Sequence, residues 1–226
     1  RERSGRSGRR RGSQKPGTLT GGCAAAPSAA AGATAAGSIL AFRAADGDLL
    51  WRRDIEGGVH ARPAIAGDRL YVPTDDGRLI AMRVDTGARL WDRRIGGQPN
   101  DVLALEERVY VGSTDNYFYA IEAATGAIAW RWPTGGDVVG LPIADDRRVY
   151  FVSMDNVARA LDFRNGAQRW KRALTLRPTR GPVRAGEALF VSGLAQNAPA
   201  YWLKDGTPAG DVQGGGELAA APHVVH

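Results

Sequence analysis

The sequence predicts an all-β fold, a β-propeller of four-stranded antiparallel blades with about five repeats of ~40 residues. Three observations support this prediction. A frame of alanine, glycine and tryptophan recurs with fixed internal spacing. Its copies follow one another at a nearly constant period, and each copy lies among short segments of strand-forming residues separated by turn signals. Such regular spacing is typical of repeat architectures rather than of a fold with a single core.

The frame reads alanine, five residues, glycine, three residues and tryptophan, and it occurs in full four times. Its members are Ala41, Gly47 and Trp51; Ala81, Gly87 and Trp91; Ala120, Gly126 and Trp130; and Ala160, Gly166 and Trp170. A fifth copy has Ala200 and Gly206, but Gly210 stands where the tryptophan is expected. The strictness of the frame predicts that each copy occupies the same place in its repeat.

The second repeat shows how one unit divides into four strands. The expected strands cover residues 62–66, 69–73, 78–83 and 88–93. Asp76-Gly77 between the second and third strands predicts a tight hairpin turn, because glycine accepts the positive φ that such turns require. The equivalent turns end in Asn116 and Asn156, and asparagine is the next most tolerant residue at positive φ.

An aromatic residue marks the second strand of four units, ten residues before each alanine of the frame. These residues are Tyr71, Tyr110, Tyr150 and Phe190. The first unit has Ala31 at this position, within a segment of alanine and glycine, and it is also shorter than the others. We therefore expect a weak or missing second strand in the first unit.

The positive charge of the chain is concentrated at its beginning. Seven of the 30 Lys and Arg residues lie within residues 1–15, and the remaining chain has 23 basic and 23 acidic residues. We expect residues 1–20 to form a disordered basic tail and residues 21–226 to form the repeats. The balanced charge of the repeats predicts no nucleic-acid partner. Units are expected to end near Trp51, Trp91, Trp130, Trp170 and Gly210, and residues 213–226 to begin a sixth.

The frame, preceded by Tyr-Val and a turn, resembles the tryptophan-docking motif of the PQQ-like (pyrroloquinoline quinone) β-propeller repeat family. The resemblance covers about residues 21–226 and is closest in character to the non-catalytic BamB-type propellers of outer-membrane assembly. It implies that the tryptophan of one blade packs against the neighbouring blade. In this interpretation the alanine keeps the strand thin where the indole ring lands, and the glycine holds the turn.

The family also implies two different functions. Its quinoprotein dehydrogenases hold PQQ against a ring made by adjacent, disulfide-bonded cysteines and bind calcium, but this sequence has one cysteine. We therefore expect a non-enzymatic scaffold for protein partners in the periplasm or cell envelope, without cofactor or metal. A fragment of a PQQ-dependent dehydrogenase, whose PQQ and calcium ligands lie elsewhere, is the alternative. The sensor domain of a larger receptor is a third possibility.

Few other residues indicate a binding site. Arg177, Arg180 and Arg184 form a basic cluster in a long connection, and we single them out as a possible partner contact. Trp202 is expected to replace the missing tryptophan of the fifth unit, or else to mark an exposed binding edge. The three histidines are interpreted as strand residues rather than metal ligands: His60, His223 and His226.

Membrane attachment has little support in the sequence. No run of 18 apolar residues is present, so no transmembrane segment is predicted. Cys23 is interpreted as a residue at the entry to a strand, with a lipid anchor as the alternative. Two outcomes are open for the ends of the repeat region. The units form an open arc, as part of a larger ring, or the last segment closes onto the first unit.

Overall fold

The computed structural model describes residues 19–213, which form twenty strands in five four-stranded antiparallel sheets. The first two sheets comprise β1 (Leu19–Ala25), β2 (Ala29–Thr34), β3 (Ser38–Arg43) and β4 (Leu49–Asp54), then β5 (Ala64–Ala66), β6 (Arg69–Thr74), β7 (Arg78–Arg83) and β8 (Arg89–Arg94). The third comprises β9 (Pro99–Ala104), β10 (Arg108–Ser113), β11 (Tyr117–Glu122) and β12 (Ile128–Pro133). The last two comprise β13 (Val138–Ala144), β14 (Arg148–Ser153), β15 (Val157–Asp162) and β16 (Gln168–Ala173), then β17 (Val183–Ala185), β18 (Ala188–Phe190), β19 (Asn197–Trp202) and β20 (Pro208–Gln213). The predicted all-β fold of four-stranded blades is confirmed.

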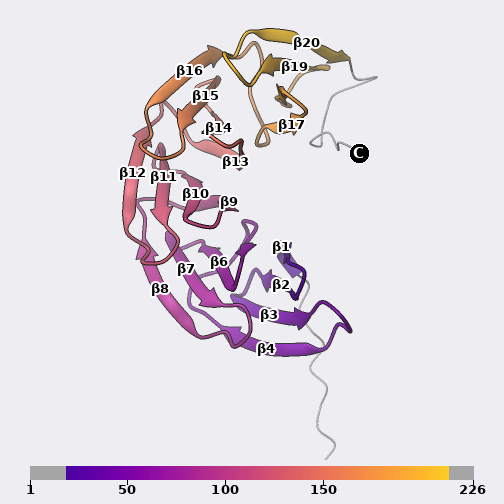
Figure 1. Ribbon diagram of the computed structural model, residues 1–226, viewed down its shortest axis with the longest axis vertical. Helices are drawn as coiled ribbons and strands as arrows, with labels where there is room; N and C mark the ends of the chain where they lie inside the picture. The colour runs from indigo at the N-terminus through magenta and orange to yellow at the C-terminus, as the bar shows by residue number, and fades with distance from the viewer. Residues whose placement is uncertain (1–18, 214–226) are drawn as a thin grey trace, which may run out of the picture.

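The five sheets follow one another along an open arc (Figure 1). Within each unit the strands pair in sequence order, so the first strand lies on the inner side of the arc and the fourth on the outer side. Among the described residues, the first and fifth units remain apart in Figure 1. No helix in residues 19–213 is long and apolar enough to cross a membrane.

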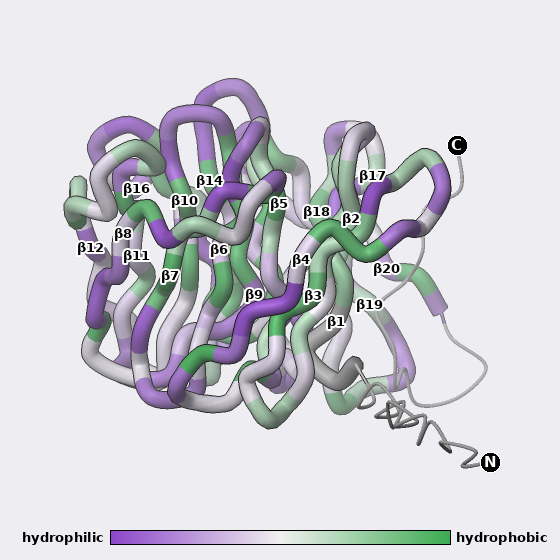
Figure 2. The backbone as a smooth tube through the Cα atoms, turned by 90° about the horizontal axis from the view of Figure 1, so that it is seen from below, coloured by the Kyte–Doolittle hydropathy of each residue, from purple (hydrophilic) through white to green (hydrophobic). Residues whose placement is uncertain are grey.

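The arc has two faces, which the ends of the strands define. One face carries the turns between the second and third strands and the connections from each unit to the next, and we call it the connection face. The opposite face carries the turns between first and second and between third and fourth strands, and we call it the turn face. Figure 2 shows hydrophobic residues along the strands and hydrophilic ones mainly in the loops at both faces.

The hydrophobic core lies between neighbouring sheets rather than inside any one of them. One buried cluster combines Tyr71 and Ala81 of the second unit with Val109, Val111 and Tyr119 of the third. A single sheet leaves both of its faces apolar, so each unit depends on its neighbours for burial. This arrangement makes the contacts between units the main source of stability in the arc.

The hairpin turns have the backbone conformation that the sequence predicted. Asn116 and Asn156 are the only described non-glycine residues with positive φ, at 64° and 58°, and Gly77 has φ of 85° at the equivalent place. Asparagine tolerates this region because its short polar side chain bonds locally. The prediction from Asp-Gly and Asp-Asn pairs is therefore confirmed.

The expected weakness of the second strand in the first unit is wrong. β2 is a full six-residue strand that pairs with both β1 and β3, and Ala29, Ala31 and Ala33 are buried within it. Because β2 is central, ladder hydrogen bonds on both sides outweigh the low strand propensity of alanine and glycine. The short second strand is instead β18 in the fifth unit, with three residues.

The expected boundaries need one adjustment. β1 begins at Leu19, so residues 19 and 20 belong to a strand and not to the basic tail. Cys23 lies in β1 opposite Gly32, in agreement with its interpretation as a strand residue. Residues 1–18 of the expected tail, and residues 214–226 with the start of the expected sixth unit, lie outside the described residues.

Candidate functional site

The repeated frame forms a row of side chains across each sheet. In the second unit, Tyr71, Ala81 and Trp91 are directly opposite one another on three neighbouring strands. The alanine is small enough for the two flanking rings to meet above it, with centroids 5.8 Å apart. Tyr150 and Trp170 repeat this contact at 5.8 Å in the fourth unit. The alanine thus lies beside the tryptophan of its own unit, whereas the sequence interpretation placed it where a neighbour's ring lands.

The glycine of the frame receives the indole from the preceding unit. A methyl carbon placed on Gly87 would lie 2.8 Å from Cδ2 of Trp51, so no larger residue fits beneath the ring. The indole Nε1 of Trp51 donates to the carbonyl oxygen of Val84 at 2.8 Å. The same ring-on-glycine contact joins Trp91 to Gly126, Trp130 to Gly166 and Trp170 to Gly206.

We call the contact between two neighbouring units a seam. Arginines two residues after three of these tryptophans add hydrogen bonds across it. Arg53 donates to the carbonyl oxygen of Thr86, Arg93 to that of Gly126 and Arg172 to that of Gly206. The sequence interpretation missed these residues, although their fixed spacing from the tryptophan was a visible signal. The third unit has Trp132 at this position. We infer that tryptophan, glycine and arginine together hold the units rigidly.

The three arginines singled out from the sequence do not form one cluster. Arg177 lines a hollow on the connection face, whereas Arg184 in β17 lines a different hollow on the turn face. The connection between them passes close to Gly140 of β13 at Gly181, on the inner side of the arc. The connection thus carries Arg177 and Arg184 to opposite faces, and the role of Arg177, Arg180 and Arg184 in a partner contact stays a prediction.

Two other sequence interpretations have clear outcomes. Trp202 is 42% exposed at the end of β19, so it does not replace the missing tryptophan in a buried seam. Nδ1 of the exposed His60 lies 2.5 Å from a carboxylate oxygen of Asp75. Within residues 19–213 no three His, Cys, Asp or Glu side chains gather where they could hold a metal ion. His223 and His226 lie outside the described residues.

A largely apolar groove of about 530 Å³ opens on the connection face and is the candidate functional site. Three units contribute to it, through Asn100, Thr114, Asp137, Val138, Val139, Met154, Arg177, Pro178, Thr179 and Leu194. Leu194 is 63% exposed and Met154 is 36% exposed. Exposed apolar side chains within a polar rim are typical of surfaces that bind proteins.

Backbone hydrogen bonds hold the walls of this groove in place. The amide of Met154 donates to the carbonyl oxygen of Asp137 at 2.8 Å, and that of Leu194 donates to the carbonyl oxygen of Arg177 at 3.2 Å. Pro178 also pairs with Gly193 in an isolated β-bridge. The exposed side chains of Met154 and Leu194 therefore project from an ordered loop backbone, which lowers the entropy cost of binding.

An ion pair stabilises the turn that carries Met154. Asp155 and Arg159 meet at 2.6 Å, and the Ser153 hydroxyl and the Gly135 amide also donate to the Asp155 carboxylate. Burial raises the pKa of this carboxyl, but the hydrogen bond from Arg159 and the others outweigh it and lower the pKa to about 2. The carboxylate thus stays charged and fixes the turn at ordinary pH.

Comparison with known proteins identifies BamB proteins among the relatives of this chain. A family model described as "Outer membrane protein assembly factor BamB" matches residues 2–105 and 95–209. Outer membrane protein assembly factor BamB of Shewanella oneidensis is 42% identical over 53 residues, which cover 24% of this chain and 13% of that protein.

Solved structures share the fold. The crystal structure of BamB from Moraxella catarrhalis has a TM-score of 0.77 at 22% identity, and the match covers 87% of this chain and 65% of that one. The computationally designed Ika8 protein has a TM-score of 0.72 at 14% identity, and the match covers 85% of this chain and 61% of the design. The chain thus spans less than two thirds of the length of these proteins.

Proposed function

Because this chain belongs to the BamB family of PQQ-like β-propellers, we propose that it is a non-catalytic scaffold that binds protein partners during outer-membrane protein assembly. The family match over most of the chain carries this proposal. The role itself is that of the family and of the matched relative, which are outer-membrane protein assembly factors. The same kinship supports a place in the bacterial periplasm or cell envelope.

The groove on the connection face supports the scaffold role. Leu194 and Met154 present apolar surface that a partner side chain would bury, and Asp137 and Arg177 at the same groove offer polar contacts at its rim. A rigid platform with a partner site formed by its loops is the usual way in which propellers act. We propose this groove as the main partner site.

We also propose that the chain itself binds neither PQQ nor calcium. A PQQ site of the dehydrogenase kind within this chain would need two adjacent cysteines, and the sequence has only Cys23. A titration of the purified protein with PQQ and calcium, followed by a dye-reduction assay with alcohols, tests this proposal. Dye reduction that depends on added PQQ would favour the dehydrogenase alternative.

The scaffold role is tested in the native host. We expect that deletion of the gene lowers the level of folded β-barrel proteins in the outer membrane, measured by heat-modifiable migration on gels. Wild-type protein restores this level, whereas the double variant Leu194→Asp, Met154→Asp does not. Leu49→Asp serves as the control, because Leu49 is 53% exposed on the outer strand of the first unit, away from the groove. Unchanged barrel levels after deletion would contradict the proposal.

A further inference from the structure

The charge at equivalent positions of the turn face differs between the units. A backbone hydrogen bond marks one equivalent position in each unit: Ser28, Asp68, Glu107, Arg147 and Glu187 each accept from the residue that follows the third strand. Three of these five residues are acidic, one is a serine, and among the described units only the fourth has an arginine. Because the fold tolerates an acid at this position, Arg147 is not required by the architecture.

Two further positions carry arginine in the fourth unit. Arg164 occupies the place of Asp85 in the second unit and Ala124 in the third, and the fifth unit also has a cation there, Lys204. Arg169 immediately precedes the frame tryptophan, where the second unit has Leu90 and the third has Ala129. Arg147 before β14, together with Arg164 and Arg169 around the turn between β15 and β16, thus supplies additional positive charge to one place, where the sheet itself does not need it.

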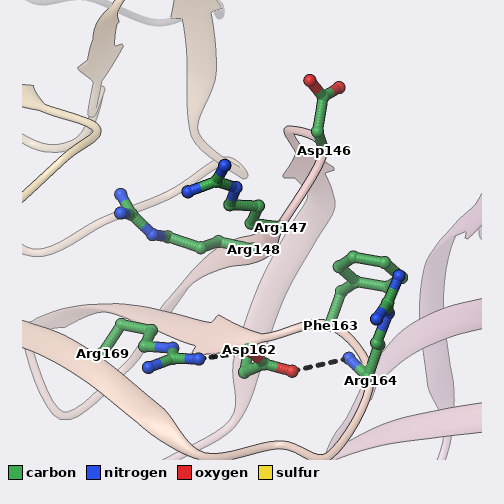
Figure 3. A pocket seen from close by; sticks show the side chains of 7 residues that line it. All are labelled: Asp146, Arg147, Arg148, Asp162, Phe163, Arg164 and Arg169. Atoms are coloured by element: carbon green, nitrogen blue, oxygen red, sulfur yellow. Dashed lines mark hydrogen bonds and ion pairs between the residues drawn. The ribbon is translucent and has the colours of Figure 1, made fainter.

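These arginines surround a hollow of about 550 Å³ (Figure 3). Its lining comprises Asp146, Arg147, Arg148, Asp162, Phe163, Arg164 and Arg169. Arg169 pairs with Asp162 at 2.6 Å, and Arg148 donates to the carbonyl oxygen of Leu203 at 2.7 Å. The guanidinium of Arg164 lies over the ring of Phe163, 5.4 Å from its centroid.

A second hollow of about 310 Å³ extends this surface towards the fifth unit. It shares Asp146, Arg147 and Arg148 with the first hollow and adds Arg184 and Lys204. We call the six cations of the two hollows the basic strip: Arg147, Arg148, Arg164, Arg169, Arg184 and Lys204. The strip spans two units, so its shape suits an extended ligand rather than a single small ion.

The unpaired charges of the strip are mostly positive. Among the described residues, the side chains of Arg147, Arg164 and Lys204 make no hydrogen bond or ion pair, and Asp146 is the one lining carboxylate in the same state. The other acids are already engaged: Asp162 with Arg169, Asp145 with Tyr150 and Glu187 with Arg184. The strip therefore offers an excess of cations that have no partner within residues 19–213.

The third unit is the opposite case on the same face. Its hollow is lined by Glu106, Glu107 and Glu122 together with Arg69 and Arg108. Acidic and basic surfaces thus follow each other along the turn face. Such an alternation repels a ligand of one charge from one unit and attracts it to the next, which fixes where the ligand binds.

We propose that the basic strip binds an acidic stretch of a partner polypeptide. This inference rests on the proposed scaffold role and names the chemistry of one partner. Carboxylate side chains match the spaced guanidinium groups, and Phe163 offers a partly buried ring for an intervening apolar residue. Asp146 and Asp162 within the strip disfavour densely charged polyphosphates, whereas a peptide tolerates them because its amides also donate hydrogen bonds.

Fluorescence anisotropy of a fluorescein-labelled hexaglutamate peptide tests the proposal on the purified protein. We expect wild-type protein to bind the peptide more tightly than labelled hexaglutamine, with binding weakened by salt. The double variant Arg147→Glu, Arg164→Glu is expected to lose about tenfold or more in affinity. The control variant Arg62→Glu, Arg94→Glu changes the net charge equally, at exposed arginines that have no ion pair among the described residues. We expect it to bind like wild type.

Three outcomes would overturn the inference. They are no binding of hexaglutamate by wild type, an equal loss in both double variants, and strip-dependent binding of phosphatidylglycerol vesicles without binding of hexaglutamate. The last result would assign the strip to a lipid surface. Arg147→Gln, Arg164→Gln replaces the reversal variant if the latter unfolds. The peptide assay on purified protein is independent of the barrel-assembly test in cells. If the peptide does not bind but barrel assembly depends on the protein, this inference is wrong and the proposed scaffold role is unaffected.

Discussion

In the third seam the Tyr110 hydroxyl takes the carbonyl oxygen that corresponds to the acceptor of the frame indole in the other seams, and Trp130 is left without it. The Tyr110 hydroxyl donates to the carbonyl oxygen of Phe163 at 2.7 Å, and the buried indole nitrogen of Trp130 has no partner among the described residues. In the other seams the indole takes the equivalent carbonyl oxygen. Aromatic stacking compensates for the missing indole hydrogen bond, since the ring centroids of Phe118 and Phe151 lie 4.1 Å apart across the two units.

Removing the Tyr110 hydroxyl is expected to have little effect on stability. In Tyr110→Phe the carbonyl oxygen of Phe163 becomes available to Trp130, so one hydrogen bond replaces another and the free energy of unfolding changes by less than about 1 kcal/mol. Tyr150→Phe loses a bond to the Asp145 carboxylate and is expected to cost about 2 kcal/mol. Urea unfolding compares the two variants. An equal cost in both would show that Trp130 does not take over the carbonyl oxygen of Phe163.

Replacing a frame glycine is expected to cost more stability where an indole ring packs on the glycine than where none does. Gly47 and Gly87 have similar positive φ, at 78° and 67°, but a methyl group on Gly47 would contact nothing within 4 Å. Gly47→Ala therefore costs only backbone strain of about 1 kcal/mol, whereas Gly87→Ala adds a clash with Trp51 of about 1–3 kcal/mol. Urea midpoints of the two variants measure the difference. Equal midpoints would show that the indole does not constrain this position.

Acid is expected to weaken the turn beside the groove. The pKa of Asp155 falls from 3.8 to about 2 in the folded protein. A carboxyl whose pKa is lower in the folded state stabilises that state above the unfolded pKa, and this contribution disappears as the pH falls through the folded pKa. Unfolding free energy is therefore expected to drop between about pH 4 and pH 2. Asp155→Asn should be less stable at neutral pH and show a smaller drop; an identical pH profile would contradict this explanation.

Much of the fold was predictable from the sequence because each unit repeats the same local signals. The turns at Gly77, Asn116 and Asn156 could be predicted because glycine and asparagine accept positive φ. The error at β2 has a physical cause as well. Strand propensity describes a residue alone, whereas Ala31 is held by strands on both sides.

The surfaces were less predictable, because they combine residues from distant parts of the chain. Met154 and Leu194 meet at one groove although they belong to different units, and Arg177 and Arg184 separate although they are close in sequence. The seam arginines are a different case. The spacing of Arg53, Arg93 and Arg172 from the frame tryptophans was visible, but their role required the positions of the neighbouring carbonyl oxygens.

Site-specific cross-linking in living cells tests the scaffold role most directly. A photoreactive amino acid replaces Leu194 in the groove or, as the control, Leu49 on the first unit; these residues are 63% and 53% exposed. We predict that the protein labelled at position 194 cross-links to a component of outer-membrane protein assembly, identified by mass spectrometry, and that the protein labelled at position 49 does not. The same partner at both positions, or none at position 194, would contradict the proposal that this groove binds the partner.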